Sequence, residues 1–155
     1  MELHACHALH VKPVGVIGGI FPGTPGVSGR TRRALNSPDR LSHMHITALA
    51  GGVGGARFVR GLRHHLDTTP GLADSTVTVI ANTGDDITLF GLRVCPDLDT
   101  LLYTLAGLAD PSRGWGRENE TWKFMEALEQ LGGPTWFRLG DADLALHVER
   151  TRQLA

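Results

Sequence analysis

The sequence is poor in the residues from which disulfide frameworks and zinc modules are built. Its two cysteines, Cys6 and Cys95, lie far apart in the sequence, so neither a disulfide framework nor a zinc site is indicated. This cysteine content favours a reducing compartment. No basic run is long enough to suggest nucleic-acid binding, and no apolar stretch is long enough to span a bilayer. The apolar segment 11–21 lacks a basic leader and is interrupted by proline and glycine, so it does not fit a signal peptide. We expect a cytoplasmic protein with no nucleic-acid or membrane partner.

Lysine is nearly absent as well. Of the 15 cationic residues, only Lys12 and Lys123 are lysines. Arginine suits planar anions such as phosphate, although genomic base composition produces the same bias and is the explanation we prefer. With 155 residues, 41% of them hydrophobic and 20% charged, the chain has the length and composition of one folded domain.

Residues 1–43 and 44–155 differ in composition. The first segment is rich in glycine, proline and serine and has no sustained period, so we expect a disordered or irregular N-terminal extension. It contains four potential metal ligands, which we interpret as incidental because no scaffold is predicted for them: His4, Cys6, His7 and His10. Met44 opens the ordered part and is a candidate translation start.

From Met44 onward, alternating periods predict an α/β fold. β-branched or alternating apolar runs indicate strands, and apolar residues three and four apart indicate amphipathic helices. The expected order is strand 45–50, helix 57–66, strand 75–82, helix 98–108, helix 120–131, strand 135–139 and helix 140–154. This order predicts a Rossmann-like parallel sheet with flanking helices and right-handed crossovers. The sheet is expected to be incomplete at the C-terminus, because no strand follows the last helix.

Four glycines follow the first predicted strand. In folds of this class, ligands lie beyond the carboxyl ends of the strands, where glycines let a diphosphate approach the free N–H groups of the next helix. The loop is not a full G-x-G-x-x-G, because Arg57 takes the third glycine position, and it lacks the Gly-Lys-Ser/Thr of a Walker A loop. A tight turn that binds nothing is the alternative. We predict phosphate contacts for Gly51, Gly52, Gly54 and Gly55.

Acidic and amide side chains follow the second predicted strand and open the next helix, so both groups should border the same crevice. The residues concerned are Asn82, Thr83, Asp85, Asp86, Asp97 and Asp99. Carboxylates are preferred Mg²⁺ ligands, and Mg²⁺ neutralises the charge of a diphosphate. Turn formation and helix capping are the alternatives. Two acidic pairs beside a glycine loop favour a metal–phosphate site.

No Ser-His-Asp or Cys-His arrangement can be identified. Cys95 is interpreted as a packed, inert thiol. His147 lies on an apolar helical stretch and is interpreted as a core histidine whose hydrogen bonds are satisfied.

Several strings between Met44 and residue 155 are long and distinctive. They are ITALAGGVGGARFVRGL, NTGDDITLFGLRVCPDLDTLLYTLAG, DPSRGWGRENETW and PTWFRLGDADLALHVERTRQ. Together they closely resemble the N-terminal part of the 2-phospho-L-lactate transferase family, which acts in coenzyme F-420 biosynthesis. The resemblance supports Met44 as the natural start and identifies residues 44–155 as the N-terminal part of a transferase Rossmann-like domain.

The resemblance implies a reaction. A guanosine-diphosphate-linked lactyl donor, or an enolpyruvyl version in some bacteria, meets the deazaflavin Fo. The terminal ribityl hydroxyl of Fo attacks the acid-bearing phosphorus, GMP leaves, and Mg²⁺ assists. The expected partners are therefore these small molecules, and a homodimer is a possible assembly.

The resemblance also implies roles for the residues near the glycine loop. The loop, with Asn82 and Thr83, would hold the donor phosphates, and Asp85 and Asp99 would be the catalytic carboxylates. The Mg²⁺ ligands implied are four aspartates: Asp85, Asp86, Asp97 and Asp99.

For the acceptor, Asp99 and Arg138 lie where some family members contact Fo. Trp115 would stack on a flat ring or serve as a loop anchor. The chain departs from the family where many members read GDRDLATH, because Ala142 and Leu146 replace an arginine and a threonine. Family members are also longer than the matching part, so an impaired or inactive truncated product is expected as one outcome.

Two other function classes compete with the transferase. Nucleotide-sugar-binding regulators of the related gluconeogenesis-factor branch share the glycine-rich opening but lack PDLDT and RGWG. A generic Rossmann oxidoreductase would require a third glycine and an acidic residue at the end of the second strand, where this chain has Asn82. Both readings are therefore disfavoured.

Overall fold

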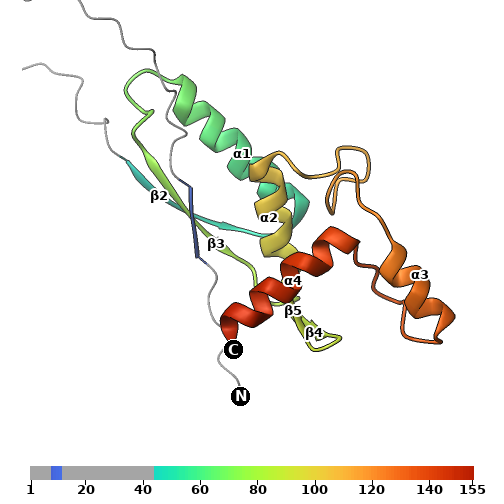
Figure 1. Cartoon of the computed structure of the whole chain (residues 1–155). Coiled ribbons are helices and arrows are strands. Elements are labelled where there is room, and N and C mark those ends of the chain that lie inside the picture. Colours follow the sequence, from blue (N-terminus) through green and yellow to red (C-terminus); the bar gives the residue numbers. More distant parts are fainter. Residues whose placement is uncertain (1–7, 12–43) are drawn as a thin grey trace, which may run out of the picture.

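The computed structural model describes residues 8–11 and 44–155, which form an α/β fold (Figure 1). Its elements are β1 (Ala8–Val11), β2 (His45–Ala50), α1 (Gly52–Thr68), β3 (Thr76–Ala81), β4 (Ile87–Leu89), β5 (Leu92–Val94), α2 (Pro96–Ala106), α3 (Lys123–Gln130) and α4 (Asp141–Leu154). The parallel pair β2–β3 with its flanking helices confirms the predicted fold class. In these two ranges, no helix is both long and apolar enough to cross a membrane.

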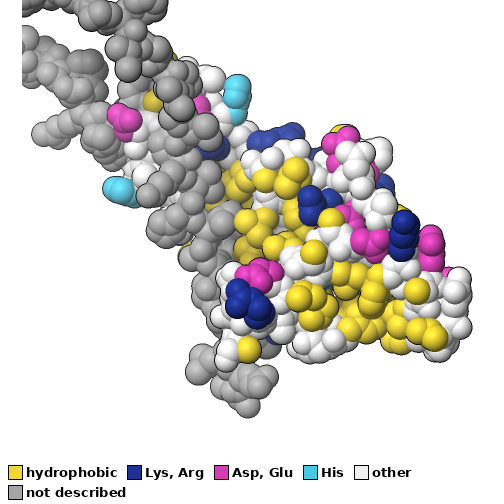
Figure 2. Space-filling model, in the orientation of Figure 1, with side chains coloured by type: hydrophobic (Ala, Val, Ile, Leu, Met, Phe, Trp, Pro, Cys, Tyr) yellow, Lys and Arg dark blue, Asp and Glu magenta, His cyan; other side chains and the backbone are white. Residues whose placement is uncertain are grey.

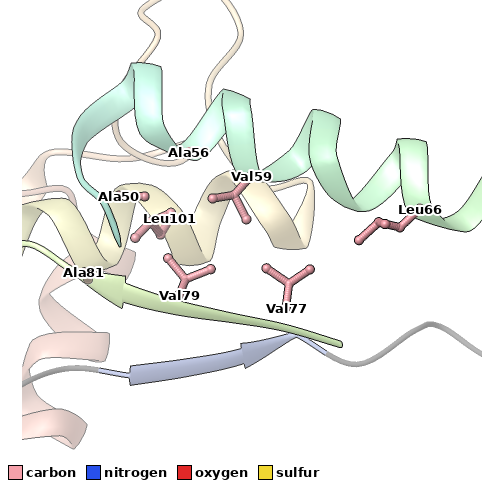
Figure 3. Packing of buried hydrophobic residues seen from close by; sticks show 8 residues of the cluster. All are labelled: Ala50, Ala56, Val59, Leu66, Val77, Val79, Ala81 and Leu101. Carbon is pink, nitrogen blue, oxygen red and sulfur yellow. The ribbon is translucent and has the colours of Figure 1, made fainter. Parts of the chain in front are cut away.

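The β2–α1–β3 unit holds the main apolar core. In the parallel register of the two strands, Ile46 lies opposite Val77 and Ala50 lies opposite Ala81. Alternate side chains of β3 are buried, as the period of two predicts for a strand with one face against helices. The core contains residues of both strands, α1 and α2: Ala50, Ala56, Val59, Leu66, Val77, Val79, Ala81 and Leu101 (Figure 3). This packing fixes where β2 and β3 end relative to α1 and α2.

Strand β1 is an element for which the sequence shows no strand pattern. It pairs antiparallel with β3 and gives a three-stranded sheet of order β1-β3-β2. A strand edge carries unpaired N–H and C=O groups, and β1 pairs those on one side of β3. β1 lies inside the segment 1–43 that was predicted to be irregular. The rest of that segment, including His4, Cys6 and His7, lies outside the described residues.

The strand predicted at 135–139 is wrong, because that segment is irregular in the structure. A strand requires backbone hydrogen bonds to a neighbouring strand, and residues 135–139 form no such pairing with the described strands. The segment contributes apolar side chains to the core instead. Phe137 and Leu139 pack in a second apolar cluster with the β4–β5 hairpin and α4. Hydrophobic side chains also reach the surface over α3 and α4 (Figure 2). Trp136, between these helices in the sequence, is 72% exposed.

The β4–β5 hairpin was not predicted either. Leu89 pairs with Leu92, so only Phe90 and Gly91 form the loop. Both have positive φ, 54° and 76°, as a type I′ turn requires. Glycine accepts this conformation readily, whereas phenylalanine is a poor signal for it, so the turn was not recognised in the sequence.

The starts of α3 and α4 cap each other. Asp141, the first residue of α4, accepts hydrogen bonds from the backbone N–H groups of Lys123 and Phe124 at 3.2 and 3.1 Å. Glu120, just before α3, accepts one from the N–H of Ala142 at 3.1 Å. Each carboxylate therefore satisfies free donors of the other helix and lies at its positive end. We call this arrangement the reciprocal cap.

Candidate functional site

The glycine loop and the polar residues after β3 meet at one edge of the sheet, as predicted. β2 and β3 are parallel, so their carboxyl ends lie side by side, and the N–H of Asn82 donates to the carbonyl of Ala50 at 3.2 Å. A surface hollow at this edge is lined by 49–51 from β2 and its loop and by 80–82 from β3 and its loop. Gly51 and Asn82 thus face the same opening.

The amide of Asn82 organises this edge. Its Nδ2 donates to Oδ2 of Asp97 at 2.9 Å and to Oδ1 of Asp85 at 3.2 Å. Its Oδ1 accepts from the N–H of Gly84 at 3.0 Å, which holds the turn after β3. A carbonyl of the same turn, that of Thr83, accepts from the N–H of Asp86 at 3.2 Å. Asn82 therefore joins one carboxylate of this turn to one in the first turn of α2.

Two loop glycines are required by this geometry. A Cβ on Gly51 would overlap the Asp97 carboxylate and lie 2.9 Å from Cβ of Asn82, which is closer than real Cβ contacts allow. Gly52 has a φ of +62°, a conformation that favours glycine. Gly55 lies against Ala50, because a Cβ there would be 3.2 Å from the alanine Cβ. An added Cβ on Gly54 would meet no described atom within 4 Å, so the packing of the fold does not require a glycine there.

The electrostatics of this edge favour a bound cation. Partial burial raises the pKa of Asp85 above its usual value, and the negative charges of Asp97 and Asp86 raise it further. Within residues 8–11 and 44–155, no three histidine, cysteine or acidic side chains are grouped to hold a metal ion. Mg²⁺ is commonly bound by one or two carboxylates together with substrate phosphates. Asp85 and Asp97 could supply two ligands to such an ion.

Two of the four predicted metal ligands are engaged elsewhere. The side chain of Asp86 is fully buried and pairs with Nη2 of Arg93 at 2.9 Å. Asp99 is paired by both terminal nitrogens of Arg150, one of them 3.1 Å from Oδ2. The structure therefore brings Asp85 and Asp97 to the glycine loop, while arginines hold Asp86 and Asp99.

A second hollow lies on the other side of the first turn of α2. Its polar lining includes Asp99 and Arg138, the two residues that the resemblance placed at the acceptor. Its apolar lining is formed by Val94, Pro96, Trp115, Phe137 and Leu139. Trp115 is 48% exposed, so part of its surface is free to contact a ligand. We call this hollow the α2 pocket.

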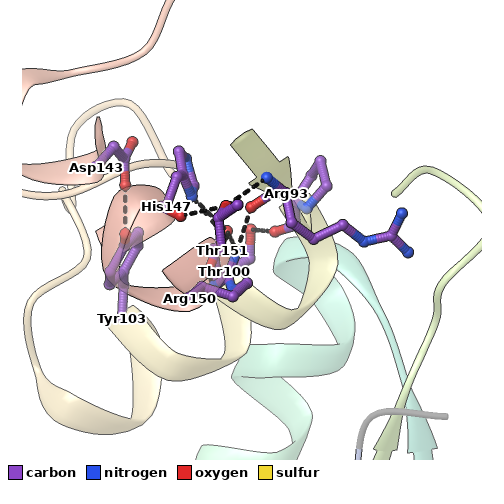
Figure 4. A network of polar contacts seen from close by, with 9 residues as sticks. Arg93, Thr100, Tyr103, Asp143, His147, Arg150 and Thr151 are labelled. Carbon is purple, nitrogen blue, oxygen red and sulfur yellow. Dashed lines mark hydrogen bonds and ion pairs between the residues drawn. The ribbon is translucent and has the colours of Figure 1, made fainter. Parts of the chain in front are cut away.

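A buried polar network underlies the α2 pocket (Figure 4). The hydroxyl of Tyr103 donates to Asp143, and the Arg150–Asp99 pair lies beside His147. Burial lowers the pKa of His147, and the charge of Arg150 adds to that shift. The sequence predicts a core histidine whose hydrogen bonds are satisfied, but Nε2 of His147 has no hydrogen-bond partner in the part of the chain that the structure describes. Cys95 is buried, in agreement with its interpretation as a packed thiol.

Three members of this network were not singled out as site residues: Tyr103, Asp143 and Arg150. Asp143 belongs to the stretch GDAD at the start of the last predicted helix, where aspartate is also common as a helix cap. Arg150 is three residues after His147, so both lie on one helix face, and that spacing could have indicated the pair. Tyr103 offered no signal beyond being the only tyrosine of the chain.

Tyr103 provides a direct test of the network. Burial raises the pKa of Tyr103 well above its ordinary value of 10.0, and the hydrogen bond to Asp143 and its charge raise it further. The unfolded chain then loses the phenol proton first. The free energy of unfolding should therefore fall as the pH rises above about 10.

Because the chain has one tyrosine, ultraviolet phenolate absorbance reports Tyr103 alone. We expect no phenolate in the folded chain at a pH where the urea-unfolded chain is largely ionised. Tyr103→Phe should remove this absorbance change. In this variant the free energy of unfolding should also fall less steeply above about pH 10. Equal titration in the folded and unfolded chains would contradict a buried phenol.

Comparison with known proteins adds a family and its relatives. A family model described as 2-phospho-L-lactate transferase CofD matches residues 46–155. The chain is 56% identical over 115 residues to a phosphoenolpyruvate transferase of Thermobifida fusca, a match that covers 72% of this chain and 36% of the relative. Proteins of the same name from Streptomyces coelicolor and Mycobacterium tuberculosis are 54% and 50% identical over 112 and 119 residues, covering 72% of this chain and 33% and 36% of the relatives. The chain thus spans about a third of the length of these curated relatives.

Proposed function

The chain belongs to the 2-phospho-L-lactate transferase family, and we propose that it takes part in coenzyme F-420 biosynthesis. The proposed reaction transfers a 2-phospholactyl or enolpyruvyl phosphate group from a guanosine-diphosphate-linked donor to the deazaflavin Fo. A phosphorus–oxygen bond forms to the ribityl hydroxyl of Fo, which gives up its proton, and GMP departs with the electrons of the bond that breaks. Such a transfer depends mainly on alignment, charge neutralisation and exclusion of water.

The donor half of the proposal rests on the glycine loop. The diphosphate lies against Gly51–Gly55 and the N-terminus of α1, where free N–H groups and the helix dipole favour an anion. Asn82 and Thr83 border the same opening. Asp85 and Asp97 are the residues that would hold Mg²⁺, which would neutralise phosphate charge in the reaction. Support comes from the hydrogen bonds by which Asn82 holds these two carboxylates together.

The acceptor half rests on the α2 pocket. Asp99 and Arg138 provide its polar contacts, and Trp115 provides a flat surface on which a ring can stack. Asp97 and Asp99 are two residues apart in the first turn of α2, one directed to the glycine loop and one to the pocket. In this proposal, α2 sets the position of the donor relative to the acceptor hydroxyl. We therefore assign the metal ion to Asp85 and Asp97 and keep Asp99 for the acceptor.

The single observation that carries the proposal is the convergence of Gly51, Asn82 and Asp97 at the carboxyl ends of β2 and β3. Because the chain spans about a third of the length of its relatives, the test uses a chain extended to their full length, mixes it with Fo, Mg²⁺ and each of the two donors, and measures GMP by chromatography. We expect GMP with one donor and none when Fo is omitted. Nucleotide binding without GMP release would favour the regulator class instead, and neither binding nor release would contradict the transferase.

A further inference from the structure

His147 is a buried polar residue that the proposed reaction does not use. It belongs to α4, is 1% exposed, and contributes to the lining of the α2 pocket. Its Nδ1 lies 3.4 Å from Nη1 of Arg150 and 3.8 Å from Oδ2 of Asp99. The other ring nitrogen, Nε2, is buried and has no hydrogen-bond partner among the described residues, 8–11 and 44–155.

The neighbours of the ring determine which nitrogen carries the hydrogen. Arginine has only donors, so Nδ1 must accept from Arg150, and the distance from Nδ1 to Asp99 is too long for a hydrogen bond. In a neutral imidazole the hydrogen then lies on Nε2. His147 therefore presents a buried N–H group without an acceptor, and such a group costs free energy until an acceptor reaches it.

Each acidic group of the network already accepts a hydrogen bond. Asp143 accepts the hydroxyl of Tyr103, and Asp99 accepts both terminal nitrogens of Arg150. His147 contributes to the lining of a pocket whose remaining lining is largely apolar and aromatic. A ligand that fills this pocket can supply the acceptor that Nε2–H lacks.

We propose that the Nε2–H group of His147 donates a hydrogen bond to a ring carbonyl oxygen of the flat heteroaromatic ligand in the α2 pocket. The inference rests on the proposed function, in which that ligand is the deazaflavin ring of Fo. Carbonyl oxygens lie in the plane of such a ring, so one can meet a donor at the inner wall while the ring face contacts Trp115. His147 then sets the depth and orientation of the ring.

The test compares two variants in the full 155-residue chain. His147→Gln keeps an N–H donor close to the position of Nε2, and His147→Leu keeps an apolar volume but removes the donor. Fo binding is measured by its fluorescence at fixed pH, and far-ultraviolet circular dichroism checks that both variants fold. In parallel, nitrogen-15 NMR of the wild-type imidazole reports which ring nitrogen is protonated and whether Nε2 shifts when Fo is added.

We expect His147→Leu to weaken Fo binding about 10-fold or more, as for loss of one buried hydrogen bond, and His147→Gln to stay within about threefold of the wild type. The NMR spectrum should show the Nε2–H form and a shift of Nε2 upon binding. Wild-type affinity in a folded His147→Leu chain, equal losses in both variants, or an Nδ1–H form would each overturn the inference while Fo binding still supports the acceptor site. No Fo binding by the wild type would refute the acceptor half of the proposed function, and this inference with it.

Discussion

Replacing Arg150 with methionine is expected to lower the free energy of unfolding by about 3–5 kcal/mol. Asp99 has a side chain only 8% exposed, and Arg150 pairs with both of its carboxylate oxygens. Methionine preserves much of the packing but leaves a buried carboxylate beside the neutral ring of His147. A domain of this size is usually stable by only about 5–15 kcal/mol, so the variant should be close to unfolding.

Urea denaturation followed by circular dichroism measures this change, and α4 offers a matched control. Arg152 pairs with Glu149 on the same helix, but the two side chains are 70% and 49% exposed. Arg152→Met should leave the denaturation midpoint unchanged, because exposed ion pairs contribute little. Adding Asp99→Asn to Arg150→Met should recover part of the loss, because it removes the buried charge. Equal losses for Arg150→Met and Arg152→Met would show that burial of Asp99 does not govern the effect.

Gly51→Ala is expected to weaken binding of Mg²⁺ and GDP about 100-fold, equivalent to about 2.7 kcal/mol. The new Cβ would overlap the Asp97 carboxylate and press on Asn82. Relief of that overlap breaks the 2.9 Å hydrogen bond between Asn82 and Asp97 and separates Asp97 from Asp85. It also places a methyl group where the backbone must approach the phosphates. Isothermal calorimetry with GDP and Mg²⁺ measures the loss.

Gly61→Ala is the matched control for this experiment. Gly61 lies on the exposed side of α1, away from the loop, and an added Cβ there meets nothing within 4 Å. Alanine favours a helix interior over glycine by up to about 1 kcal/mol, so this variant should be slightly more stable and bind GDP as before. GDP binding by Gly51→Ala within a few-fold of the wild type would exclude the glycine loop as the diphosphate site.

The sequence was most informative where local pattern and tertiary packing agree. The strand at 45–50, the glycine loop and the strand near 75–82 were predicted, because alternating β-branched residues and punctuating glycines carry that information locally. The helix predicted at 57–66 extends over Gly52–Thr68, so it begins within the loop glycines and not after them. The convergence of Gly51 with Asn82 followed from parallel strands alone.

The remaining features depend on partners that are distant in the chain. The segment 135–139 has the composition of a strand, but it is not paired with another described strand. A strand prediction based on composition alone is therefore wrong there. Asp97 and Asp99 look alike in the sequence, and only the packing of α4 against β5 brings Arg150 to Asp99 and leaves Asp97 for Asn82. Such a division of roles between neighbouring aspartates cannot be obtained from spacing. It requires the position of a side chain 51 residues away.

The reciprocal cap has a consequence for the position of Arg138. The segment 123–140 begins and ends at the reciprocal cap, because residues 120–124 contact residues 141–142. At the same place, the N–H of Asp141 donates to the carbonyl of Thr121 at 2.9 Å. Both ends of this segment, which contains Arg138, are thus joined at one junction. Phe137 and Leu139 pack the same segment into the apolar cluster with the β4–β5 hairpin, so the junction and this cluster together set the position of Arg138 at the α2 pocket.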